Sequence, residues 1–109
     1  MIPLGVEVFV ALGPVDMRLG MERLGGLVRE TMGREPRSRA LFVFINKRRT
    51  MVKVLSWDGT GMVLWHKKLD RGLFEVPRAT RADATSVVLS EAAFEALFAG
   101  LSTEVRSVH

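Results

Sequence analysis

The residues best suited to chemistry in this sequence are cations. Lys47-Arg48-Arg49 lie in a short polar break between two apolar runs, and Lys67-Lys68 and Arg71 follow a third such run. Adjacent cations repel one another unless they are solvated or meet anions. A cluster of this kind is typical of a surface that binds phosphate groups. The alternative is a solvated rim that keeps edge strands from aggregating, which would use the same residue types.

The charge of the whole chain is modest but unevenly distributed. The net charge is +4, yet the segment 34–81 contains twelve of the sixteen basic residues and four of the twelve acidic ones. This polarity favours a polyanionic partner on one side of the molecule. No predicted helix has a row of exposed arginine, asparagine and glutamine for a major groove, so we expect DNA to be bound with weak sequence specificity.

Groups suited to catalysis or metal binding are sparse. The histidines are His66, in a strand-like run, and the terminal His109, and there is no cysteine. Asp16, Asp58 and Asp70 stand where caps and turns favour aspartate. We therefore predict a protein that is not an enzyme, with no catalytic residue, no metal site and no cofactor. A small nuclease that uses these aspartates with a divalent ion is the catalytic alternative.

One domain must position these groups, because 109 residues suffice for a single core. We expect a core over about 4–101 and a C-terminal tail over 102–109. One helix is predicted from Asp16, as its cap, to about Met32, and another follows Ser90. Apolar and β-branched runs predict strands at 6–12, 41–45, 51–57, 62–69 and 73–76, with a further apolar run at 86–89.

The three central runs predict an antiparallel meander, because the breaks between them have hairpin length. The second break contains Asp58-Gly59, a pair that suits hairpin turns. In a meander the break 46–50 and the end of the third strand lie at the same end of the sheet, so their cations should converge. Arg18 stands apart from them and is expected either to pair with Glu22 or to anchor a ligand. The predicted nucleic-acid-binding residues are Lys47, Arg48, Arg49, Lys53, Lys67, Lys68, Arg71 and Arg18.

The predicted fold class is α+β. We expect an antiparallel sheet of about five strands around the central three-strand meander, with two helices packed mainly on one face. Apolar residues point to both faces of the central strands, so one face would stay bare and a homo-oligomer is expected. No apolar run is long enough to cross a bilayer, and the N-terminal segment lacks a signal-peptide pattern. We therefore expect a cytoplasmic protein without a membrane partner.

These segments, taken in order, resemble a known protein family. They are Val15-Asp16-Met17-Arg18 before a glycine-containing helix, 41–44 followed by Asn46-Lys47-Arg48-Arg49, Lys53-Val54-Leu55, 57–61, Lys67-Lys68-Leu69 and 71–74. The ordered set is similar to the TnpB accessory protein (second open reading frame) of the insertion-sequence family sixty-six, over about residues 1–101. The chain departs from that pattern at Ser56, where a second aromatic residue is common, and at Val76-Pro77, which lacks the usual tryptophan.

The resemblance implies a non-catalytic protein that is encoded beside a larger transposase in a bacterial mobile element and is needed for efficient transposition. It implies the transposase and the other accessory protein of the element as partners. Together with the cations, it favours a DNA-binding accessory factor. The alternative is a protein–protein adaptor that docks on the transposase through an apolar sheet face without touching DNA.

Overall fold

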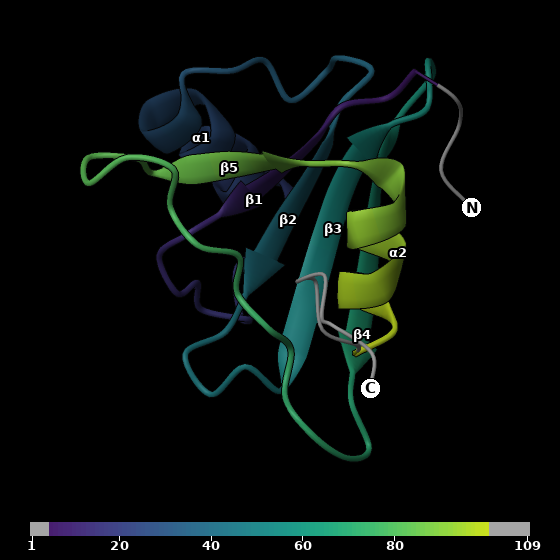
Figure 1. Ribbon diagram of the computed structural model, residues 1–109. Helices are drawn as coiled ribbons and strands as arrows, with labels where there is room; N and C mark the ends of the chain where they lie inside the picture. Colours follow the sequence, from purple (N-terminus) through teal and green to yellow (C-terminus); the bar gives the residue numbers. More distant parts are fainter. Residues whose placement is uncertain (1–4, 101–109) are drawn as a thin grey trace.

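The structure, a computed structural model, describes residues 5–100 and contains one five-stranded sheet in the order β4-β3-β2-β1-β5 (Figure 1). The α+β class and the central meander are confirmed, since β2, β3 and β4 pair antiparallel in sequence order. The predicted tail, 102–109, lies outside the described residues. The elements are β1 (Val8–Ala11), α1 (Met21–Met32), β2 (Leu41–Ile45), β3 (Met51–Trp57), β4 (Met62–Lys68), β5 (Ser86–Leu89) and α2 (Glu91–Phe98).

The sheet is mixed because β1 pairs parallel with β2, in the register Val8 with Leu41. Parallel neighbours need a crossover connection, which α1 provides. The fifth strand is β5, antiparallel to β1, and the predicted strand at 73–76 is absent. That segment instead packs on one face of the sheet, where Phe74 is fully buried and Val76 is packed against the same core.

The two helices cover opposite faces of the sheet, where we expected both mainly on one. Leu24 and Val28 of α1 pack with Phe42 and its neighbours on one face, and Leu97 of α2 packs with Val43 on the other. Figure 1 shows α2 in front of the sheet and α1 behind it. The physical reason is that side chains alternate along strands that are apolar on both sides. A homo-oligomer stays a prediction, but no bare sheet face now requires one.

The segment before α1 is a loop and not the first turn of a helix. Helix α1 begins at Met21 after Gly20, which provides no side-chain cap, so the predicted start at Asp16 is wrong. The loop passes the end of β2, where the Val15 N–H donates to the Ile45 carbonyl at 3.0 Å. Within residues 5–100, neither helix is long and apolar enough to cross a membrane.

Candidate nucleic-acid interface

The turn between β2 and β3 is shaped by Asn46. Its Oδ1 accepts from the N–H groups of Thr50 at 2.9 Å and Met51 at 3.0 Å, and its Nδ2 donates to Thr50 Oγ1 at 3.1 Å. Arg49 adopts a left-handed conformation with φ 60°, and its N–H donates to the Asn46 carbonyl. None of these bonds uses a side chain of residues 47–49, all of which are exposed. The turn therefore presents three cations to solvent.

The end of β4 and the segment after it return to this turn. Met51 pairs with Lys68 in the β3–β4 ladder. Beyond the ladder, the Leu69 N–H donates to the Thr50 carbonyl at 3.0 Å, and the Phe74 N–H donates to the Arg49 carbonyl at 2.6 Å. The structure thus brings the two basic stretches to one end of the sheet, the lower end in Figure 1.

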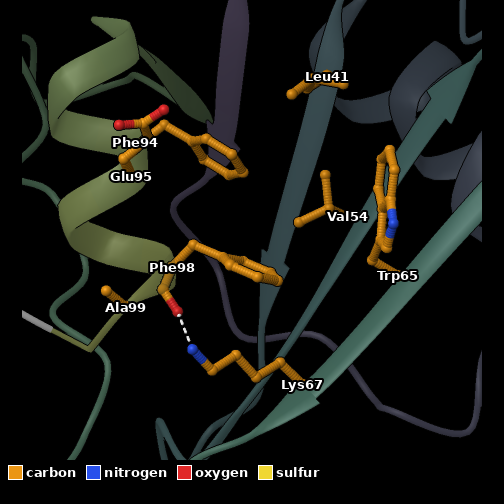
Figure 2. Close-up of a pocket in the computed structure, with 8 residues that line it drawn as sticks. All are labelled: Leu41, Val54, Trp65, Lys67, Phe94, Glu95, Phe98 and Ala99. Carbon is orange, nitrogen blue, oxygen red and sulfur yellow. Dashed lines mark hydrogen bonds between the residues drawn. The ribbon is translucent and has the colours of Figure 1, made fainter. Parts of the chain in front are cut away.

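Two of the predicted lysines are held inside the fold. Lys53 is only 8 % exposed, and its Nζ donates to the Leu19 carbonyl at 2.9 Å. Lys67 is half-buried on the other face of the sheet. Its Nζ donates to the Phe98 carbonyl at 2.7 Å and lies 4.9 Å from the centre of the Phe98 ring (Figure 2). These two lysines tie a loop and a helix to the sheet. The exposed set, here called the basic rim, is Lys47, Arg48, Arg49, Lys68 and Arg71.

The rim cations have no carboxylate partner within residues 5–100. None of the ion pairs Arg18–Asp16, Arg29–Glu35 and Arg81–Asp83 involves a rim cation. Asp70 is exposed between Lys68 and Arg71 but forms no ion pair with a rim cation. Unpaired cations that share one end of a sheet give a local positive potential.

Arg18 lies beside the rim and is not isolated from it. It lines a shallow groove of about 540 Å³ together with Lys47 and Arg48, because the Val15–Ile45 bond holds its loop against the end of β2. The expected pairing with Glu22 is wrong. Arg18 Nε and Nη2 instead donate to the Asp16 carboxylate at 2.8–3.1 Å. Glu22, four positions away, was the expected partner because both residues were predicted to lie in one helix, where that spacing brings side chains together.

The Asp16 carboxylate fixes the Arg18 side chain and its own turn. Its Oδ1 also accepts from the Arg18 backbone N–H at 2.8 Å. The side-chain hydrogen bonds from Arg18, followed by this backbone bond, lower the pKa of Asp16 to about 2. Arg18 remains 91 % exposed, and within the described residues its Nη1 makes no hydrogen bond. That nitrogen can therefore still donate to an anion.

The other candidate groups have structural surroundings. Asp58 Oδ1 accepts from Thr60 N–H, Thr60 Oγ1 and Gly61 N–H at 2.8–3.0 Å. The backbone bonds from Thr60 and Gly61 are the main causes that lower the pKa of Asp58. His66 is exposed on β4, opposite Lys53 in the ladder. Across residues 5–100, no three histidine, aspartate or glutamate side chains gather as metal ligands would.

A separate apolar pocket, of about 260 Å³, lies between α2 and the sheet. Phe94 and Phe98 of α2 point toward Val54 and Trp65 across it (Figure 2). Trp65 is 46 % exposed although it stands in the sheet. Its exposure follows from the position of β4 at the edge of the sheet.

Comparison with known proteins gives the family. A family model described as IS66 Orf2 like protein matches residues 6–107. The chain belongs to the IS66 Orf2-like family. The resemblance drawn from the ordered segments is thereby confirmed, and membership makes the chain an accessory protein of an insertion sequence.

Two relatives of this IS66 Orf2-like chain come from Sinorhizobium fredii (strain NBRC 101917 / NGR234). Uncharacterized protein y4hO is 36 % identical over 103 residues, which cover 93 % of this chain and 87 % of the relative. Uncharacterized protein y4jC is 36 % identical over 97 residues, which cover 89 % and 80 %. No solved structure matches the chain.

Proposed function

We propose that this insertion-sequence accessory protein binds DNA through the basic rim while it assists a separate transposase in the bacterial cytoplasm. The observation that carries the proposal is the meeting of exposed cations from two stretches, none of them paired with a carboxylate within residues 5–100. The rim consists of the turn at 47–49, the last residue of β4 and the segment after it, with no helix to enter a groove. Contacts to phosphates therefore dominate, and sequence specificity is weak.

The test is a matched pair of double variants in a DNA-binding assay by fluorescence anisotropy. Arg48→Ala with Lys68→Ala removes two charges from the rim, and we expect it to weaken binding to all duplex sequences alike. Arg23→Ala with Arg39→Ala removes the same charge from exposed positions on α1 and before β2. We expect this control to bind nearly as the parent chain does. Equal losses in both variants would contradict the rim as the binding surface.

The second candidate function is an adaptor that docks on the transposase without direct DNA contact. The apolar pocket beside α2 favours it, because Trp65 is large, exposed and adjacent to Phe98 across that pocket (Figure 2). Exposed tryptophan is a frequent anchor in protein interfaces. Trp65→Ser should then abolish co-purification with the transposase and leave DNA affinity unchanged. Unchanged co-purification would remove this surface as the docking site.

A further inference from the structure

The groove beside the basic rim combines positive charge with an apolar floor. Its basic lining residues are Arg18, Lys47 and Arg48. Its apolar lining, here called the floor, includes Val15, Met17 and Met51. Phosphate alone would be satisfied by the cations, so the apolar floor calls for a ligand that also has an apolar surface.

We propose that this groove holds an unpaired nucleotide, so that the protein prefers single-stranded DNA to duplex DNA. The proposal rests on the proposed function and makes its ligand more specific. In a duplex the faces of the bases are stacked inside the helix, and the rim can reach only the backbone. In a single strand a base can lie on the groove floor while its flanking phosphates meet the cations that line the groove.

The chemistry of the floor suits a base. Methionine is unbranched and polarisable, and its sulfur makes favourable contacts with aromatic rings. Met17 and Met51 come from different segments, the loop before α1 and the start of β3, and each is only partly buried. The groove volume of about 540 Å³ lies within the range of small-ligand sites. It has room for one nucleotide.

The charge of the groove is suited to a backbone that runs along it. Asp16 is the carboxylate among its lining residues, and its charge is neutralised by the bonds from Arg18 Nε and Nη2. Lys47 and Arg48 have no such partner within residues 5–100. Arg18 lines the same groove, and its Nη1, which makes no hydrogen bond within residues 5–100, can donate to the same ligand. A strand in the groove therefore meets donors from Arg18 as well as from Lys47 and Arg48.

The experiment compares three labelled ligands of one length and one salt concentration by fluorescence anisotropy. They are a single-stranded oligonucleotide, the matching duplex, and a single strand of stable abasic (tetrahydrofuran) residues. We expect the single strand to bind more tightly than the duplex. The abasic strand, which keeps the phosphates and loses the bases, should bind about threefold to tenfold more weakly than the normal strand.

A protein variant tests the floor directly. Met51→Ala should weaken binding of the normal single strand and leave binding of the abasic strand and of the duplex unchanged. The comparison of the three ligands uses the parent chain, so it tests the proposal even if Met51→Ala folds poorly. Duplex binding equal to or tighter than single-strand binding would overturn this inference while the DNA-binding function stands. Absence of binding to all three ligands would overturn both.

Discussion

Asp16 and Arg18 form a local pair in which one carboxylate holds both the backbone and the guanidinium of a residue two positions later. The pair places a cation at the groove without any contribution from a helix. Such local side-chain bonds compete with helix formation, because the aspartate satisfies nearby backbone N–H groups in a turn. The chain therefore enters α1 only after Gly20.

The pH dependence of this pair follows from the lowered pKa of Asp16. The folded value is about 2 against an ordinary 3.8, so the ionised pair stabilises the loop above about pH 4. This stabilisation is lost as the pH falls through 2. A carbon-detected NMR titration of the Asp16 carboxyl should show a midpoint of about 2. In Arg18→Ala the midpoint should move up toward 3.8, and a parent midpoint already there would contradict the pairing.

Arg49 offers a second prediction at this scale, because it is the non-glycine residue with positive φ among the described residues. Left-handed backbone costs roughly 1–2 kcal/mol for a residue with a Cβ. Arg49→Gly should therefore raise the free energy of unfolding by about 0.5–1 kcal/mol, after the extra chain entropy of glycine in the unfolded state. Arg48→Gly is the matched control and should lower that free energy. Urea denaturation measures both, and the same sign in both variants would contradict the strain.

At the scale of elements, the two lysines that face into the fold separate stability from binding. Lys53→Met removes the donor to the Leu19 carbonyl, which lies 34 positions earlier. We expect the free energy of unfolding to fall by about 1–3 kcal/mol and DNA affinity to stay unchanged. Lys68→Met should weaken DNA binding and leave the free energy of unfolding unchanged, since Lys68 is exposed on the rim. Urea denaturation and anisotropy, run on both variants, check this, and a binding loss in Lys53→Met would return that residue to the interface.

The sequence was sufficient to predict the meander, since its strands are apolar, β-branched and joined by short polar breaks. The convergence of the basic stretches followed from that topology. The faces covered by the helices could not be predicted, because Phe42 and Val43 make both sides of β2 equally apolar. Lys53 was read as exposed because the carbonyl that it binds is distant in the sequence. The face that each helix covers and the burial of Lys53 depend on tertiary packing, which the local sequence pattern does not reveal.

At the scale of the whole molecule, the groove beside the basic rim and the pocket beside α2 share no lining residue. The rim lies at one end of the sheet, whereas the Trp65 pocket lies under α2. Two of the larger exposed apolar side chains, Trp65 on β4 and Val88 on β5, stand at opposite edges of the sheet. Covered sheet faces and a polar end suit a protein that meets its partners through separate surfaces.

The number of cations in the basic rim predicts how salt affects DNA binding. If the five rim cations each neutralise about one phosphate, the logarithm of the association constant should fall against the logarithm of salt concentration with a slope of about −4 to −5. Removing two rim cations should reduce the magnitude of that slope by about two. Anisotropy titrations at several salt concentrations measure it. A flat response would contradict direct binding to the DNA backbone.

The turn at 46–50 is closed by bonds from the backbone and from Asn46, with no contribution from the cationic side chains. A chain in which Lys47, Arg48 and Arg49 are replaced by glutamate should therefore keep its fold and its pocket beside α2. In a cell that carries the insertion sequence, we expect such a chain to interfere with the unmodified chain. If the chain binds the transposase and DNA as proposed, this variant would occupy the transposase without binding DNA, and so would inhibit transposition in a dominant manner.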